Sequence, residues 1–308
     1  MELEIIRWLR ERLPTTDRVT LGPGDDAAVV SWEKAPASII ACDTIAEGLD
    51  FILDDCTLEQ VGHKALGINL SDLAAMAAHP VAATVSLILP QKAPLATCKG
   101  ITEGMISLAD RYSIALVGGD VTIWDGPLVV TVNVIGEPGP HGTWRRAGAV
   151  SGDALLVTGN LGGSIRGHHL DFEPRIKESQ ELAAKYEIKA AIDISDGLAI
   201  DTTRLASESG LGVILHLDGI PVAEAAHALS RDTSDTATPL EHALGDGEDF
   251  ELLFAVNEAQ VESILADKQL GCPVAYIGTF VEDRGLWTRD KTGQLTALPA
   301  TGYLHGAQ

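Results

Sequence analysis

The chain has 308 residues, 45% of them hydrophobic, which is enough for one large domain or two ordinary ones with buried cores. Lys and Arg number 22 against 44 Asp and Glu, giving a formal net charge of −22 at pH 7. A surface this acidic repels nucleic acid and anionic membranes, so neither is expected as a partner. Most of these carboxylates are expected to serve solubility alone.

Cysteine spacing and the N-terminal pattern both favour a cytoplasmic protein. The four cysteines, Cys42, Cys56, Cys98 and Cys272, form no Cys-x-x-Cys pair, which argues against a zinc site and a disulfide framework. Residues 1–13 alternate charged and apolar residues at helical spacing, predicting an amphipathic surface helix without a signal-peptide core. No apolar run approaches the roughly 20 residues that a membrane-spanning helix needs.

The first half of the chain alternates strand and helix patterns. One helix opens with the capping-box sequence Thr57-Leu-Glu-Gln60 and continues at helical spacing through Met76, and a second fits Pro94–Arg111. β-rich runs predict strands at Ser38–Asp43, Val81–Leu89, Ile114–Val117 and Leu128–Ile135. This order predicts an α+β layer, with helices packed on a mostly antiparallel sheet.

The second half restarts after a region rich in glycine and proline. Residues 148–152 mark the boundary, predicting domains at 1–148 and 149–308. Gly159–Ser164 would cradle a phosphate if a helix begins after it, although a plain strand–helix turn is favoured. Helices are expected between strands at Ala154–Thr158, Ala190–Ile194, Gly212–Leu217, Glu251–Val256 and Val274–Phe280.

Six short aspartate clusters, each beside glycine or a helix start, are the main chemical signal. They are Gly24-Asp25-Asp26, Asp43-Thr44, Asn69-Leu-Ser-Asp72, Gly118-Gly-Asp120, Asp193-Ile-Ser-Asp-Gly197 and Gly247-Glu-Asp249. Magnesium takes oxygen ligands and is usually shared between one or two carboxylates and substrate phosphates. Glycine lets a phosphate approach the backbone closely. The clusters therefore predict one folded-together site for a magnesium–nucleotide complex.

Two of these clusters follow predicted strands. An apolar strand leads into Asp193, and Ser195 and Asp196 then cap a new helix; capping explains Asp196 but not Asp193. Gly118-Gly-Asp120 follows Ile114–Val117, with a tight turn as the alternative interpretation. Asp72 lies in an otherwise buried helical stretch, where a hydrogen-bonded structural role is the alternative.

Taken together and in order, these motifs resemble the thiamine-monophosphate kinase family. Its superfamily includes aminoimidazole ribonucleotide synthetase and selenophosphate synthetase. The resemblance is carried by Gly22-Pro-Gly-Asp-Asp-Ala-Ala-Val29, Asp43-Thr-Ile-Ala-Glu-Gly48, Lys64-Ala-Leu-Gly-Ile-Asn-Leu-Ser-Asp-Leu-Ala-Ala-Met76, Val117-Gly-Gly-Asp120, Ile192-Asp-Ile-Ser-Asp-Gly-Leu198 and Gly247-Glu-Asp-Phe-Glu-Leu-Leu-Phe254.

The resemblance implies an α/β protein with the two-domain aminoimidazole ribonucleotide synthetase-like fold. An N-terminal domain would bind ATP and metal and pair in a homodimer, and a larger C-terminal α/β domain would follow. The implied reaction is ATP plus thiamine monophosphate giving ADP plus thiamine diphosphate, a step of thiamine diphosphate biosynthesis. Several Mg²⁺ ions would assist direct in-line transfer of the γ-phosphoryl group.

The resemblance also implies site residues, carried over motif by motif. The implied metal ligands are Asp26, Asp43, Asp72, Asp120, Asp193, Asp196 and the backbone carbonyl of Cys42, with Asp43, Asp120 and Asp196 as the catalytic groups. The implied ATP-binding residues are Tyr112, by stacking on adenine, with Gly119, Asp120, Arg146 and Ser195. The implied substrate-binding residues are Asp50, Glu248 and Tyr303.

Some positions depart from the family pattern. Asp50 stands where the family usually has histidine, and Cys42 replaces a hydroxyl residue; a thiol is a poor magnesium ligand. The end, Gly302–His305, lacks the family's Asp-His-Phe run. An enzyme of the same superfamily with a different phosphate acceptor, or a catalytically decayed nucleotide-binding dimer, therefore remains an alternative. The Lys64 ammonium is expected in water rather than at a phosphate.

Overall fold

The structure is a computed structural model that describes Trp8, Arg12–Leu13 and residues 16–21, 29–30, 37–232 and 235–304. Asp26 and most of the predicted helix at residues 1–13 lie outside the described residues. The chain forms two compact units, Met1–Leu73 with Ala78–Pro138, and Ala74–Ala77 with Gly139–Gln308. Assignment of functions to domains at 1–148 and 149–308 stays a prediction.

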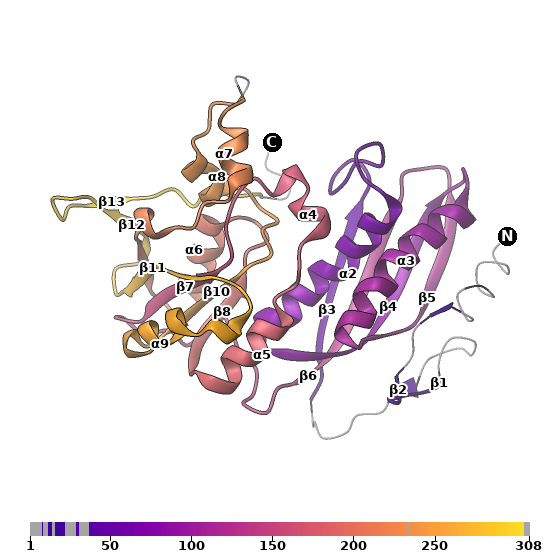
Figure 1. The fold of residues 1–308 in the computed structure, drawn as a ribbon, viewed down its shortest axis with the longest axis horizontal. Helices are drawn as coiled ribbons and strands as arrows, with labels where there is room; N and C mark the ends of the chain where they lie inside the picture. Colours follow the sequence, from indigo (N-terminus) through magenta and orange to yellow (C-terminus); the bar gives the residue numbers. More distant parts are fainter. Residues whose placement is uncertain are drawn as a thin grey trace. The chain divides into compact units, whose positions relative to one another are not determined.

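The N-terminal unit is built on a four-stranded sheet in the order β3-β6-β4-β5 (Figure 1). Its strands are β3 (Ile39–Ala46), β4 (Ala78–Pro90), β5 (Ala115–Trp124) and β6 (Val129–Pro138), and a short pair, β1 (Val19–Leu21) and β2 (Val29–Val30), lies outside this sheet. Only the β4–β5 pair is parallel. The mostly antiparallel sheet expected for this half is therefore confirmed.

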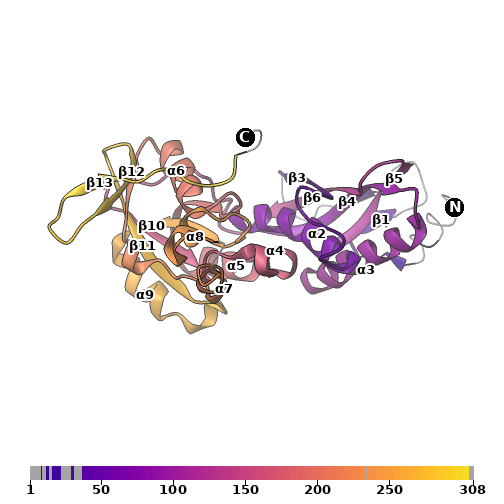
Figure 2. The ribbon, with the colours of Figure 1, turned by 90° about the horizontal axis from the view of Figure 1, so that it is seen from above.

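Helices α2 (Leu58–Ala75) and α3 (Pro94–Tyr112) lie on one face of this sheet, as Figures 1 and 2 both show. The Thr57 hydroxyl accepts the Gln60 N–H and the Gln60 side chain accepts the Thr57 N–H, which confirms the predicted capping box. Glycines allow the two helices to touch. A Cβ atom at Gly62 would lie 1.9 Å from the Ile101 carbonyl oxygen.

The strand predicted at Ile114–Val117 is longer than expected, so the Gly118-Gly-Asp120 motif lies within the strand rather than in a turn. Ile114–Val117 was expected to end before a turn at Gly118-Gly-Asp120, but β5 runs on through Trp124. Residues 118–124 pair with β4 from Thr84 to Pro90. The extension exists because β4 offers a partner along its whole length, which overrides the weak strand propensity of glycine.

The C-terminal unit contains a seven-stranded sheet in the order β13-β12-β9-β11-β7-β10-β8, with only the β12–β9 pair parallel. The strands are β7 (Ala154–Thr158), β8 (Ile188–Asp193), β9 (Gly212–Leu215), β10 (Leu252–Val256), β11 (Val274–Val281), β12 (Gly285–Arg289) and β13 (Leu295–Ala297). The last two were not predicted from the sequence. Both β7 and β10 are buried at every position, so both faces of the central sheet are covered.

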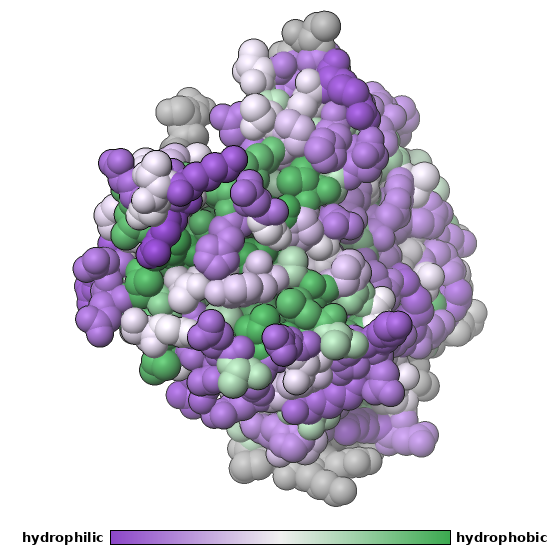
Figure 3. Space-filling view, turned by 60° about the vertical axis from the view of Figure 1, so that its left-hand side comes forward, coloured by the Kyte–Doolittle hydropathy of each residue, from purple (hydrophilic) through white to green (hydrophobic). Residues whose placement is uncertain are grey.

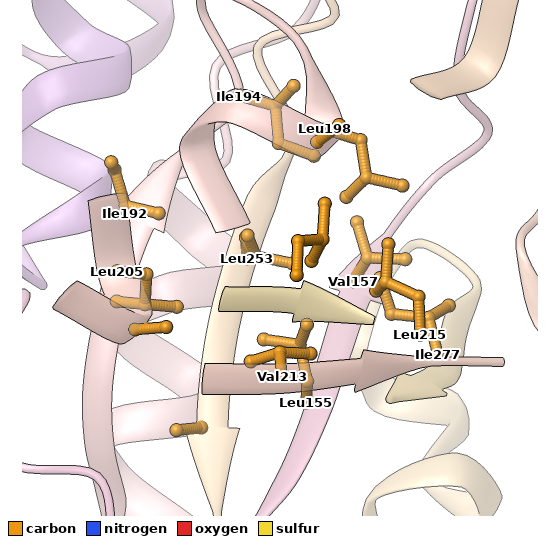
Figure 4. Packing of buried hydrophobic residues seen from close by; sticks show 14 of the residues in the cluster. Leu155, Val157, Ile192, Ile194, Leu198, Leu205, Val213, Leu215, Leu253 and Ile277 are labelled. Carbon is orange, nitrogen blue, oxygen red and sulfur yellow. The ribbon is translucent and has the colours of Figure 1, made fainter. Parts of the chain in front are cut away.

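Figure 4 shows the core on one face of this sheet, where α6 (Leu198–Glu208) packs. Leu155 and Val157 of β7, Leu205 of α6 and Leu253 of β10 belong to this cluster, and all four are fully buried. The remaining helices are α4 (His168–Asp171), α5 (Ile176–Lys185), α7 (Glu224–Leu229), α8 (Pro239–Gly245) and α9 (Val261–Ala266), with 3₁₀ turns η1 (Ser164–Arg166), η2 (Leu217–Gly219), η3 (Glu258–Gln260) and η4 (Lys268–Leu270). This core fixes the ends of β8 and β10, where site residues lie.

On the face drawn in Figure 3, hydrophilic residues surround patches of hydrophobic ones. No described helix has both the length and the apolar character required to traverse a bilayer.

Candidate functional site

Two predicted metal ligands meet in the N-terminal unit. Asp43 of β3 and Asp72 of α2 are both half-buried, and a side-chain hydrogen bond joins them. Burial raises the pKa of Asp43, and the hydrogen bond with Asp72 offsets part of this rise. Two ionised carboxylates this close repel each other unless one is protonated or a cation lies between them. The pair is thus suited to a divalent cation.

Gly119 lies in the same row of the sheet as Asp43, through Val132 and Val85. Its φ of +157° and its surroundings both require glycine, because a Cβ atom there would lie 1.7 Å from the Val85 carbonyl oxygen. Asp120 is exposed in the next row, opposite Ser86. Gly119 is therefore required for the close approach of β5 to β4 in the row that contains Asp43.

Cys42 is exposed on β3, and its register partner is Asn133 of β6. Tyr112 is half-buried at the last position of α3, where Ser113 caps the helix in the left-handed conformation. Arg146 is exposed in the C-terminal unit and makes no hydrogen bond or ion pair with the described residues. Roles for these three residues in metal or ATP binding stay predictions.

The turn after β3 is closed by the side chain that replaces the family histidine. Asp50 Oδ2 accepts the Ala46 N–H at 2.7 Å, and the Asp50 N–H donates to the Ala46 carbonyl oxygen. Lys64 is fully buried, and its Nζ donates to the Asp50 carbonyl oxygen at 2.6 Å. The expectation that the Lys64 ammonium lies in water is wrong, because the turn supplies a buried carbonyl acceptor.

In the C-terminal unit, β8 and the segment before β10 bring the remaining site residues together. Asp193 pairs with Leu252, and the chain beyond each strand stays paired: the Glu248 N–H donates to the Ser195 carbonyl oxygen at 2.7 Å. Tyr303 joins them, since its N–H donates to the Asp196 carbonyl oxygen at 2.8 Å. Predicted metal, ATP and substrate residues are thus neighbours here.

The backbone is strained beside Glu248. Glu248 has φ +62° and Phe250 has φ +50°, a region that non-glycine residues rarely occupy. The strain is held by the Glu248 bond to Ser195 and by the Phe250 N–H, which donates to the Ile194 carbonyl oxygen. Strain of this kind is concentrated at functional sites, which supports a role for Glu248.

Sequence reasoning missed Asp201, which organises the Ser195–Gly197 turn. Its carboxylate is fully buried on α6, and Oδ2 accepts the backbone N–H groups of Ser195, Asp196 and Gly197 at 3.2, 2.9 and 3.1 Å. Burial raises the pKa of Asp201, while the Asp196 amide and Arg204 lower it. The available signal was an aspartate in the first turn of a helix, where carboxylates bind free N–H groups.

In the glycine loop after β7, the N–H groups of Gly162 and Gly163 already have hydrogen-bond acceptors. The Gly162 N–H donates to both carboxylate oxygens of Asp249, and the Gly163 N–H donates to Asp246 Oδ2. Ser164 Oγ donates to the Gly247 carbonyl oxygen. The loop leads into a three-residue 3₁₀ turn, so the plain turn interpretation is confirmed over a phosphate cradle at an α-helix.

A buried ion pair supports the base of the same segment. Arg175 donates two bonds to Glu251, Nε to Oε2 at 2.7 Å and Nη2 to Oε1 at 2.5 Å, and Thr158 Oγ1 donates to Glu251 at 2.6 Å. Nearby, burial raises the pKa of the Cys272 thiol to about 12, so this cysteine is an inert packing residue. The ion pair anchors the start of β10, just after Glu248 and Asp249 in the sequence.

Each unit therefore holds part of the predicted site. The structure brings Asp43 and Asp72 together in one unit, and Asp193, Ser195, Asp196, Glu248 and Tyr303 together in the other. Within the described ranges, no group of three or more His, Cys, Asp or Glu side chains is arranged to hold a metal ion. Convergence of all six aspartate clusters on one nucleotide stays a prediction.

Comparison with known proteins gives a consistent family assignment. Residues 24–137 match AIR synthase related protein, N-terminal domain, and residues 132–290 match AIR synthase related protein, C-terminal domain. The thiamine-monophosphate kinase of Rhodopirellula baltica is 39% identical, covering 99% of this chain and 98% of that protein. The thiamine-monophosphate kinase of Escherichia coli (strain K12) is 34% identical, covering 94% and 93%.

Comparison with solved structures supports the same family assignment. Thiamine-monophosphate kinase from Stenotrophomonas maltophilia K279a has a TM-score of 0.80 at 29% identity, covering 93% of this chain and 95% of that one. A structure described as AaThiL complexed with AMPPCP and TMP has a TM-score of 0.76 at 25% identity, covering 98% and 95%. Escherichia coli HypE, at 20% identity and a TM-score of 0.81, shares the fold. The chain therefore belongs to the thiamine-monophosphate kinase family and has its two-domain, AIR synthase-related α/β fold.

Proposed function

We propose that this protein transfers the γ-phosphoryl group of ATP to thiamine monophosphate, giving ADP and thiamine diphosphate. The observation that carries the proposal is the 39% identity to a thiamine-monophosphate kinase over 99% of the chain. A related structure holds AMPPCP, an ATP analogue whose γ-phosphoryl group cannot be transferred, together with TMP. These are the two ligands that the proposed reaction requires.

Magnesium fits the donor groups of both units. The Asp43–Asp72 pair has two carboxylates in hydrogen-bonding contact, Asp193 is the last residue of β8, and Asp196 lies in the turn before α6. Pairs of carboxylates suit magnesium, which keeps several water ligands and is usually held by one or two carboxylates together with substrate phosphates. When bound, magnesium neutralises phosphate charge and stabilises the charge that develops during transfer.

The chain's own contribution is to position groups. The attacking group would be a phosphate oxygen of thiamine monophosphate, whose second pKa of about 6 leaves it largely ionised at neutral pH. No general base is then needed, which suits a site built from carboxylates. Asp201 would hold the Ser195–Gly197 turn in place, and Gly119 would let a phosphate approach the backbone of β5. Transfer would be direct and in line, without a phosphorylated protein.

The acceptor would be recognised by Glu248 and Tyr303, and Asp50, at the position of the family histidine, would be a third acceptor-binding residue. The Asp50 carboxylate closes its own turn by accepting the Ala46 N–H. Glu248 is held in a strained conformation, and Tyr303 is an exposed residue with a relative accessibility of 46%. Both therefore suit contacts with a ligand.

A homodimer through the N-terminal unit is part of this proposal. Helices cover one face of the β3-β6-β4-β5 sheet, and the strands expose residues on the other side. Ile40 of β3 and Trp124 of β5, which the register places on the same face, are 68% and 42% exposed. Exposed apolar residues of this kind mark interaction surfaces, and a second copy of the sheet would cover them. Light scattering should give twice the chain mass.

An ADP-release assay tests the activity. The purified protein is incubated with ATP and Mg²⁺, and ADP is followed with thiamine monophosphate, thiamine, or other phosphomonoesters as acceptor. The proposal expects ADP release that depends on thiamine monophosphate and forms thiamine diphosphate in equal amount. Release with another phosphomonoester alone would instead indicate a shifted acceptor, and no release with nucleotide binding intact would indicate a decayed site.

A further inference from the structure

Arg204 bridges two carboxylates at the start of α6. Its Nη1 lies 2.5 Å from Asp196 Oδ2 and 2.7 Å from Asp201 Oδ1. Asp201 is fully buried and is committed to the Ser195–Gly197 turn, whereas Asp196 is 21% exposed. The guanidinium is therefore held at a fixed point beside a predicted metal ligand.

The two oxygens of Asp196 differ in their surroundings. Oδ2 accepts the bond from Arg204, while Oδ1 accepts no hydrogen bond from any residue that the structure describes. One oxygen thus faces a positive charge and the other is available for a ligand. A divalent cation on Oδ1 would lie only a few ångströms from the guanidinium charge.

Repulsion between these charges has a direct consequence for metal binding. Arg204 is 36% exposed, so water screens it only in part, and a neighbouring unit charge changes the affinity for a divalent cation about tenfold or more. When a nucleotide binds, Arg204 can exchange its bond to Asp196 for a bond to a nucleotide phosphate, because a guanidinium also binds phosphate oxygens. This exchange removes the penalty. Arg204 should therefore oppose binding of the free metal ion more strongly than binding of the metal–nucleotide complex.

We propose that Arg204 is the resident counter-ion of Asp196 and keeps divalent metal off Asp196 until a nucleotide arrives. This inference rests on the proposed function, because it takes Asp196 as a metal ligand. It predicts that metal enters this site with the nucleotide rather than before it. Arg204 is a positioning residue in this account, since it acts on the metal through Asp196.

A purely structural role is the competing explanation. Arg204 also contacts Asp201, so its loss could loosen the Ser195–Gly197 turn and weaken metal binding. The two explanations predict opposite signs. Removal of a blocking charge strengthens binding of free metal, whereas loss of a structural bond weakens it. A metal-binding measurement without nucleotide therefore decides between them, and it does not depend on turnover.

The test is titration of the nucleotide-free protein with Mn²⁺, followed by electron paramagnetic resonance of the free ion. Arg204→Gln removes the charge, and Arg204→Lys keeps it without the planar fork. Arg231→Gln is the matched control, because it removes the same charge from an exposed ion pair with Glu224 in the same unit. Asp196→Asn is combined with Arg204→Gln to locate the added site, and circular dichroism checks that each variant is folded.

We expect Arg204→Gln to lower the Kd for Mn²⁺ by about tenfold or more, with Arg204→Lys and Arg231→Gln within about threefold of the parent. The gain should disappear in the Arg204→Gln/Asp196→Asn double variant. Unchanged or weaker binding in Arg204→Gln, or a gain that survives loss of Asp196, overturns the inference. Failure of the proposed function would give a different result: the parent protein would then bind no Mn²⁺ even when an ATP analogue is present.

Discussion

The backbone N–H of Tyr303 donates a hydrogen bond to the carbonyl oxygen of Asp196 at 2.8 Å. The chain reaches this point at Gly302, where a Cβ atom would lie 2.4 Å from Ile200 Cγ2 and 2.7 Å from the Asp196 carbonyl oxygen. The end of the described chain therefore packs directly on the start of α6. This contact places Tyr303 beside the turn that carries Asp196.

Tyr303→Ala tests the proposed acceptor contact. The bond to Asp196 uses the backbone and survives the change, and the residue is 46% exposed, so the fold should be unaffected. Loss of an aromatic contact should raise KM for thiamine monophosphate about tenfold, with KM for ATP within about twofold. Steady-state kinetics with each substrate varied gives both values. Equal changes in the two KM values would contradict the assignment of Tyr303 to the acceptor.

Asp43→Asn tests the carboxylate pair of the N-terminal unit. Asparagine keeps a hydrogen-bonding group toward Asp72 but removes the charge, so turnover should fall at least about 100-fold while the fold stays intact. We expect Asp120→Asn to reduce turnover on the same scale. Asp125→Asn, which changes an exposed residue of the same unit, is the control and should have no effect. A near-normal rate for Asp43→Asn at saturating Mg²⁺ would exclude the proposed role.

Gly119→Ala and Gly118→Ala separate a steric clash from backbone strain. Both glycines have positive φ, but only a Cβ at Gly119 would collide with the Val85 carbonyl oxygen, whereas nothing lies within 4 Å of one at Gly118. Gly119→Ala should lower the free energy of unfolding by about 1–3 kcal/mol and weaken ATP binding. Gly118→Ala should cost about 1 kcal/mol from strain. Urea unfolding and ATP titration measure the two effects, and equal losses would show that the Gly119 contact is unimportant.

Asp249→Asn tests a pH dependence of stability. Burial raises the pKa of Asp249 well above its ordinary value, because only the Gly162 amide opposes the loss of solvent. The folded state then binds this proton more tightly than the unfolded state. Its stabilising effect is full below the unfolded pKa of about 4 and is lost as pH rises through the raised pKa.

The asparagine variant keeps an acceptor for the Gly162 N–H and cannot ionise. The difference in free energy of unfolding, variant minus parent, should therefore increase as pH rises above about 4. Urea unfolding of both proteins at several pH values provides the measurement. Parallel curves across that range would show that Asp249 does not carry a raised pKa.

Local signals in the sequence predicted much of the fold. The Thr57–Gln60 capping box and the proline at the start of α3 both mark helix starts in the structure. Residues 154–158 form β7 as predicted, because a short apolar run fits a strand buried on both faces. In contrast, β5 extends past Val117 through pairing with β4, and no local pattern reveals a distant partner.

The site was predicted less completely, for a related reason. The motif containing Asp193 and Asp196 indicated a strand end and a helix start, and the structure has both. Which side chains turn back to bind that motif depends on three-dimensional packing. Asp201 and Arg204 were missed for this reason, and Lys64 was misassigned because a buried backbone acceptor is invisible in the sequence.

The most direct test of the central claim is a single-turnover reaction with ATP labelled in its γ-phosphoryl group. Enzyme in excess is mixed with labelled ATP, Mg²⁺ and thiamine monophosphate, then quenched in acid at successive times. Direct transfer predicts that label moves from ATP to thiamine diphosphate at one rate, with none on the protein. Acid-stable labelled protein that forms before the product, or release of label as inorganic phosphate alone, would contradict it.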